Sequence, residues 1–139
     1  MATIEKTKQA PETQRYPLTT FSIIVLALGW LVPGLGHYVQ RRYVRGALIQ
    51  ASILTLFFCG LAMQGKVYTS NFGNLLDILG FLGNVCIGGL YLLTRSFDWG
   101  QGAVQRAVAD YGTKYIVVAG LLNIVAMIDA YHIAIGKKK

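Results

Sequence analysis

The side chains that could take part in catalysis or ligand binding are few in this sequence. It holds two histidines, His37 and His132, and six acidic residues among 139. Asp129 and His132 are three positions apart, which places them side by side if the segment is helical. They would make at most half of a structural zinc site, which needs four ligands. We therefore expect an interfacial polar pair near the end of a helix and no bound metal.

Imidazole is also a good axial ligand for haem. A tetrapyrrole at His37 or His132 is therefore a second hypothesis, although nothing in their spacing requires one and we expect no cofactor. Cys59 and Cys86 lie inside apolar runs and form no C-x-x-C pair, so they lack the spacing of a zinc or redox site. The sequence has no G-x-S-x-G, P-loop, H-E-x-x-H or G-x-G-x-x-G motif. It therefore predicts a protein that is not an enzyme.

The composition shows which environment must position these residues. Hydrophobic residues make up 54% of the chain and charged residues only 14%, against about 25% charged residues in an ordinary globular protein. A small soluble domain has a high ratio of surface to volume and needs more polar residues than this. The composition excludes a soluble monomer and a disordered chain, and it predicts an integral membrane protein.

Four apolar runs approach the length of about 20 residues that a spanning helix needs. They lie at about 18–33, 46–65, 75–94 and 115–135, between a polar tail at 1–17 and a basic tail at 137–139. Backbone polar groups cannot stay unpaired in lipid, and the runs lack the alternation of barrel strands. The predicted fold is all-α: a polytopic bundle of about four transmembrane helices in one domain, 18–136.

The first run is interrupted by Pro33-Gly34, a pair that favours a tight turn. We predict that the helix ends there and that an elbow at the membrane interface leads into the second helix. Trp30 and Tyr38 bracket the elbow, and both residue types favour the headgroup region. The elbow residues are Pro33, Gly34, Gly36 and His37.

The basic residues sit in short clusters beside the apolar runs. The clusters suit anionic lipid headgroups and predict a bound lipid, whereas a nucleic-acid site would need a continuous basic face. On a four-span topology, Lys and Arg number seven on the side of the termini and six on the other, a difference that does not decide the orientation. We expect the termini in the cytoplasm. We expect the last helix to stop at about Gly136 and Asp129 to pair with a neighbouring helix or with a loop arginine. The predicted headgroup residues are Arg41, Arg42, Arg45, Lys137, Lys138 and Lys139.

The third run carries a stripe of small and polar residues that would share one face of a continuous helix. Small residues let helices approach closely, so we interpret Gly80, Asn84 and Gly88 as a packing seam, with Gly60 on the second helix. The alternative is a polar pathway, because ionisable groups inside a membrane are often functional. The stripe is Gly73, Asp77, Gly80, Asn84, Gly88, Tyr91 and Arg95.

Two stretches resemble a known family. The segment Trp30-Leu31-Val32-Pro33-Gly34-Leu35-Gly36-His37-Tyr38, followed by Arg41-Arg42 and Arg45-Gly46, resembles the elbow of small bacterial membrane proteins similar to the TM-two domain. The segments Tyr111–Tyr115, Val118–Asn123 and Asp129–Tyr131 are similar to the C-terminal signature of an uncharacterised TM-two-like bacterial family. The sequence departs from these patterns at Gln40, where glycine is common, and at His132, where an acidic residue is expected. The resemblance implies a multi-pass protein of the bacterial cytoplasmic (inner) membrane, without an assigned activity.

These observations favour a non-catalytic accessory subunit of a larger membrane complex, such as a respiratory or photosynthetic assembly. Its partners would be membrane lipids and other membrane-protein subunits, and not nucleic acid. The alternative is a small homo-oligomeric channel or transporter that uses Asp77, Asn84 and Asp129.

Overall fold

A computed structural model describes residues 19–68, 75–100 and 107–137 of the chain. These residues form α-helices and no strands, which confirms the predicted helical class. Of the described helices, two are long and apolar enough to cross a membrane, and a bent pair would make a third span. A bundle of four full spans is therefore not confirmed. The helices are α1 (Thr20–Leu31), α2 (Leu35–Val39), α3 (Tyr43–Ala62), α4 (Leu75–Val85), α5 (Gly89–Ser96) and α6 (Ala107–Ala134).

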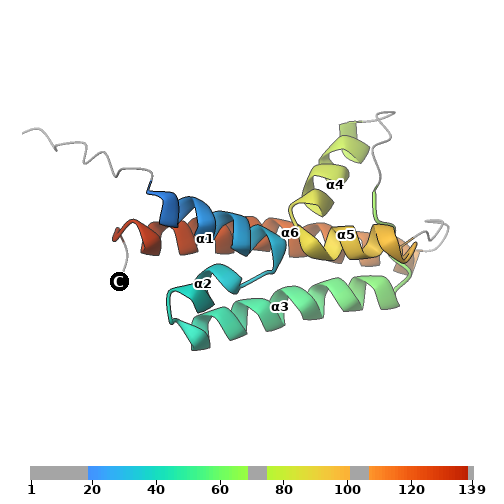
Figure 1. Cartoon of the computed structure of the whole chain (residues 1–139). Helices are drawn as coiled ribbons and strands as arrows, with labels where there is room; N and C mark the ends of the chain where they lie inside the picture. Colours follow the sequence, from blue (N-terminus) through green and yellow to red (C-terminus); the bar gives the residue numbers. More distant parts are fainter. Residues whose placement is uncertain (1–18, 69–74, 101–106, 138–139) are drawn as a thin grey trace, which may run out of the picture.

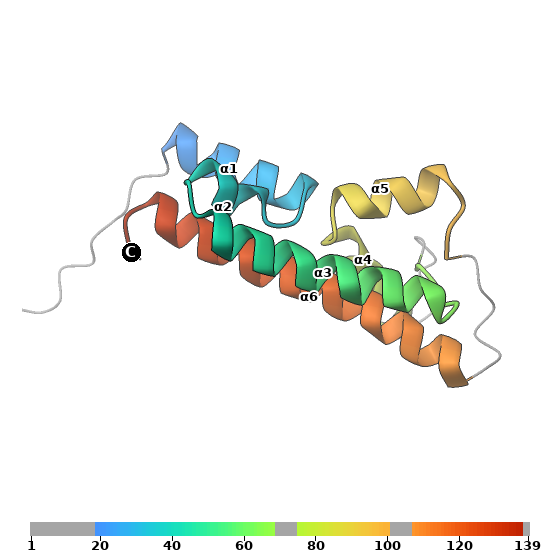
Figure 2. The ribbon, with the colours of Figure 1, turned by 90° about the horizontal axis from the view of Figure 1, so that it is seen from below.

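The two long helices, α3 and α6, form the scaffold. They run antiparallel and side by side along most of their length (Figures 1 and 2). Their contact is close because Gly60 of α3 lies against Ile116 and the backbone of Gly112 on α6. Glycine at such a point lets two helices approach closely. The buried side chains of Ile53 and Phe57 belong to the same core cluster as Ile116.

The first predicted span does not cross the bundle. With 12 residues, α1 is about 18 Å long, well short of a hydrocarbon core of about 30 Å. It ends because Pro33 forces Val32 into an extended conformation, with φ at −128°. Gly34, with φ at 84°, completes a type II turn in which the Leu35 amide donates to the Val32 carbonyl at 3.0 Å. The chain then runs back through α2 to the end at which α1 began (Figure 1).

The third predicted span is also broken. Residues 86–88 interrupt it, and α4 and α5 meet there at 109°. Gly88 makes the bend with φ at 68°, a conformation that glycine adopts without steric cost. The stripe that was predicted to share one helical face is therefore split, because Asp77 and Asn84 lie on α4 whereas Tyr91 and Arg95 lie on α5. Gly73 lies outside the described residues.

The two interrupted segments meet in the middle of the bundle. Helix α1 covers one half of the α3–α6 pair and α5 covers the other half (Figure 2). A side chain on Gly88 or Gly89 would overlap the backbone carbonyls of Trp30 and Leu31, so the end of α1 abuts the start of α5. Together, α1 and α5 make one composite layer across the scaffold.

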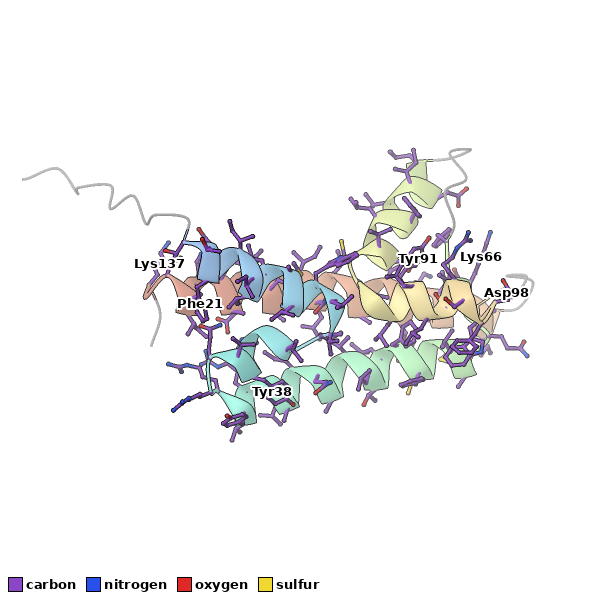
Figure 3. The ribbon with its side chains drawn as sticks, in the orientation of Figure 1. Phe21, Tyr38, Lys66, Tyr91, Asp98 and Lys137 are labelled. Atoms are coloured by element: carbon purple, nitrogen blue, oxygen red, sulfur yellow. The ribbon has the colours of Figure 1, made fainter. Side chains whose placement is uncertain are left out.

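The ends of the bundle differ from the arrangement that four spans would give. Figure 3 shows Phe21 and Lys137 at one end and Lys66 and Asp98 at the other. Because α1 and α2 form a hairpin, the start of α3 lies at the same end as Lys137. At this end Arg45 of α3 forms an ion pair with Asp129 of α6. A four-span topology would place the loop with Arg41, Arg42 and Arg45 at the end opposite the first and last residues of the bundle, and the structure does not have that arrangement. The first and last described residues and these arginines share one end, which we call the charged end.

Candidate functional site at the Arg-His-Asp cluster and the helix junction

Three polar side chains from three helices meet at the charged end. Asp129 Oδ2 on α6 lies 3.1 Å from Nε2 of His37 on α2 and 3.3 Å from Nη1 of Arg45 on α3. The side chain of His37 is 1% exposed, that of Asp129 19% and that of Arg45 40%. An ionised carboxylate only accepts hydrogen bonds, so His37 Nε2 donates to it. We call these residues the Arg-His-Asp cluster.

The short helix α2 places His37 in this cluster. Gly36 allows α2 to pack deeply, because a Cβ there would lie 3.1 Å from Ala130 Cβ on α6 and 3.0 Å from the Val25 carbonyl of α1. The Gln40 amide donates to the carbonyls of Gly36 at 2.8 Å and Ala130 at 3.0 Å. It thereby ties the end of α2 to α6.

Gln40 also accounts for one departure from the family resemblance. Its φ is −90°, a value open to any residue, so the turn needs no glycine at this position. The left-handed residue of the turn is the next one, Arg41, with φ at 60°. Glutamine at position 40 adds two hydrogen bonds that glycine could not make.

The cluster can hold three helices together by charge and hydrogen bonding. Asp129 was predicted to pair with a neighbouring helix or a loop arginine, and its arginine partner lies in the first turn of α3. His132 lies beside Tyr131, with ring centroids 6.0 Å apart. Within the described residues, no three His, Cys, Asp or Glu side chains come together in a way that could hold a metal ion.

A second feature is the helix junction, where the end of α1 meets the break at residues 86–88. The Trp30 indole donates to the Val85 carbonyl at 3.0 Å. Trp30 therefore lies against the break between α4 and α5 in the middle of the bundle. The headgroup level of Trp30 and of the elbow after it stays a prediction.

The junction contains two buried asparagines. Asn123 of α6 donates from Nδ2 to the Cys86 carbonyl at 2.9 Å, which fixes the broken backbone to α6. In the part of the chain that the structure describes, both polar side-chain atoms of Asn84 and Oδ1 of Asn123 have no hydrogen-bond partner. Buried amides are nearly always paired. These atoms therefore mark a position where a small polar ligand could bind.

One comparison with known proteins places the chain in a family. A model described as a family of unknown function, DUF6677, matches residues 24–139. The chain belongs to the DUF6677 family. No curated protein and no solved structure matches it. The resemblance to TM-two-like proteins stays a prediction, because the DUF6677 match does not address it.

In this DUF6677 chain, the other predicted site residues are distributed over several places. Asp129 belongs to the charged end, so the structure does not bring Asp77, Asn84 and Asp129 into one site. The hydroxyl of Tyr38, predicted at the headgroups, turns inward and donates to Gln50 Oε1 at 2.9 Å. The predicted glycines of the elbow and the packing seam are all buried: Gly34, Gly36, Gly60, Gly80 and Gly88. Lys138 and Lys139 lie outside the described residues.

Near the opposite end, Tyr68 packs its ring against Gly80 of α4. Burial raises the pKa of the Tyr68 phenol, and the negative charge of Asp77 raises it further. The Tyr68 side chain is therefore neutral at physiological pH and serves as an aromatic surface for α4.

Sequence reasoning missed the His37–Asp129 contact and the role of Gln40. Both residues of the contact were visible as isolated polar positions in apolar surroundings, and such groups tend to pair with one another. The choice of partner had no local signal, because 92 positions separate them.

Proposed function

We propose that this chain is a non-catalytic subunit of a larger membrane assembly and that α4 is the helix that contacts the partner. The supporting observation is that α4 leaves the bundle (Figure 1). It meets α5 at 109°, and its main helical neighbour in the described structure is α6. Three leucines on it are exposed: Leu75 by 78%, Leu79 by 62% and Leu82 by 58%.

Lipid alone is a poor neighbour for this helix. The first turn of any helix has backbone N–H groups without an intrahelical partner, and such groups are costly in hydrocarbon. The first turn of α4 also contains Asp77, and ionisable groups in membranes usually face protein or water. A partner subunit that covers α4 would remove both costs.

The test is purification of the tagged full-length chain from its native membrane in mild detergent, with mass spectrometry and an absorption spectrum. A defined larger complex is expected, and the Leu79→Ala/Leu82→Ala double variant should lose it. The matched control is Leu121→Ala/Val125→Ala on α6, where the side chains are similarly exposed, by 51% and 61%. Recovery of the parent chain alone, or equal loss in both double variants, would refute the proposal. A haem-like spectrum would instead support the tetrapyrrole hypothesis.

The second candidate is a small channel or transporter, favoured by the helix junction. Secondary transporters often place substrate sites where interrupted helices meet near the middle of the membrane. Here two interrupted segments meet beside Asn84, whose buried amide has no partner in the described structure. Ion flux in liposomes that is lost in Asn84→Leu and Asp77→Asn, but kept in Leu121→Ala, would favour this function. Flux no greater than that of empty liposomes would exclude it.

We further propose that the charged end faces the cytoplasm of a bacterial inner membrane. With the hairpin topology, the segments that join this end carry nine of the thirteen Lys and Arg residues. They are Lys6, Lys8, Arg15, Arg41, Arg42, Arg45, Lys137, Lys138 and Lys139. The four others, Lys66, Arg95, Arg106 and Lys114, join the opposite end. An excess of this size on one side is typical of cytoplasmic segments.

A further inference from the structure

Two arginines at the charged end, Arg41 and Arg42, form no ion pair with the acidic residues that the structure describes. Asp129 is occupied by His37 and Arg45. Arg41 also has φ at 60°, held by hydrogen bonds from its own amide to the Tyr38 carbonyl and from the Arg42 amide to the His37 carbonyl. Glycine is the usual residue at such a helix end. An arginine kept in a strained conformation often marks a functional position.

These arginines border a hollow. Residues 41–45 line a space of about 320 Å³ that is open to the surroundings. Guanidinium groups bind phosphate through paired N–H donors, with better geometry than lysine offers. The hollow therefore fits a phosphate group, and its position at the charged end fits the depth of a lipid headgroup.

A second, apolar cavity lies deeper in the bundle. It has a volume of about 340 Å³ and lies between the turn after α1, the middle of α3 and the start of α5. Pro33, Leu54, Leu90 and Leu93 are among its lining residues. Its one polar side chain, Gln50, already accepts a hydrogen bond from Tyr38. An apolar chain fits this cavity better than a polar molecule.

Two tyrosines connect the hollow to the cavity. Tyr43 lines the hollow, and its ring centroid lies 6.2 Å from that of Tyr38. The Tyr38 hydroxyl in turn reaches Gln50 of the cavity. Along α3, Tyr43, Gln50 and Leu54 lie on one face, because seven and then four positions separate them. Eleven helical steps separate Tyr43 from Leu54, which is about 16 Å along the axis and close to the thickness of one leaflet, about 15 Å.

We propose that this surface binds one anionic phospholipid, with its phosphate on Arg41 and Arg42 and one acyl chain in the apolar cavity. The site differs from the α4 surface of the proposed function. A failure of either proposal therefore leaves the other standing.

The test is native mass spectrometry of the purified full-length chain, titrated with dioleoyl phosphatidylglycerol or dioleoyl phosphatidylcholine. Phosphatidylglycerol should bind about tenfold more tightly, since each arginine near a headgroup contributes to attraction for an anionic lipid. Arg41→Gln/Arg42→Gln should remove this preference. Arg95→Gln at the opposite end is the matched control and should keep it. Equal binding of the two lipids, or an unchanged preference in the double variant, would overturn the proposal.

The acyl chain is tested separately. Leu54→Trp should fill the cavity and weaken binding of dioleoyl phosphatidylglycerol about tenfold. Leu90→Phe serves the same purpose if Leu54→Trp does not fold. Dihexanoyl phosphatidylglycerol and inorganic phosphate are the short-chain and free-phosphate probes, and both should compete weakly. If either probe competes as well as the dioleoyl lipid, the site recognises phosphate alone and the proposal is wrong.

Discussion

Replacing Asp129 with asparagine tests whether the Arg-His-Asp cluster holds the charged end together. The substitution keeps the size of the side chain and one acceptor oxygen but removes the charge. His37 and Arg45 then lose their charged acceptor on α6. We expect a folded but less stable protein, because the contact joins α2, α3 and α6.

The size of the effect follows from how much water reaches each partner. His37 is 1% exposed, and a hydrogen bond to a charged group contributes about 1.5–3 kcal/mol. Arg45 is 40% exposed, so its ion pair is screened and contributes about 0–1 kcal/mol. Asparagine can still accept one hydrogen bond, so the free energy of unfolding should fall by about 2 kcal/mol in total.

The measurement is equilibrium unfolding of the purified full-length chain in detergent. The matched control is Asp110→Asn, which breaks a pair with Lys114 at 2.6 Å on one helix, where the side chains are 50% and 63% exposed. That loss should be about 0.3–0.5 kcal/mol. Equal losses in the two variants would refute the stabilising role of the cluster. If Asp129→Asn instead released a metal or chromophore from intact protein, the cluster would be a ligand site.

Three further predictions concern the helix junction and the topology. Gly88→Ala should lower the unfolding free energy by about 2–5 kcal/mol through strain and overlap with α1. Gly136→Ala should cost only about 1–2 kcal/mol, because its φ of 74° is similar but no atom of the described structure outside its chain neighbours lies within 4 Å of the added Cβ. The same unfolding assay compares the two variants, and equal costs would contradict the close contact at Gly88. Trp30→Phe removes one hydrogen bond to α4 and should cost about 0.5–1.5 kcal/mol in that assay, whereas no change would mean that the bond does not stabilise the junction. In a background without native cysteines, Lys137→Cys should be labelled from the cytoplasmic side and Lys66→Cys from the other, and the reverse pattern would refute the proposed orientation.

The sequence was sufficient to predict the scaffold helices. The run at 46–65 corresponds to α3, Tyr43–Ala62, and the run at 115–135 overlaps α6, Ala107–Ala134, in all but its last residue. The start of α6 was missed because the apolar run begins after Lys114. The thickness of a bilayer sets the length of the apolar stretch but not the length of the helix. Helix α6 therefore extends beyond the apolar run, through the exposed Asp110–Lys114 pair. Its end follows local rules, since Gly136 and Lys137 close it with bonds to the carbonyls of Ile133 and His132.

The broken segments were harder to predict because the length of an apolar run does not show whether its helix is straight. Pro33-Gly34 gave a local signal, and the turn forms there. At 86–88 there is no proline, and Gly88 also fitted a packing seam. The bend depends on contacts with α1 and α6, which are distant in the sequence. The candidate sites could not be predicted from the sequence for the same reason, because tertiary packing determines which groups His37 and Asn123 contact.

The two breaks explain one another. A helix that ends inside a membrane leaves backbone groups without partners, and hydrocarbon offers none. Helices α1 and α5 point the same way along the bundle, so the carbonyl end of α1 faces the amide end of α5 and their dipoles are aligned head to tail (Figure 2). The indole of Trp30 then crosses to Val85, and Asn123 fixes Cys86. The end of α1 and the break between α4 and α5 therefore lie where they make polar contacts with each other and with α6. Neither interrupted segment would have these contacts alone in lipid.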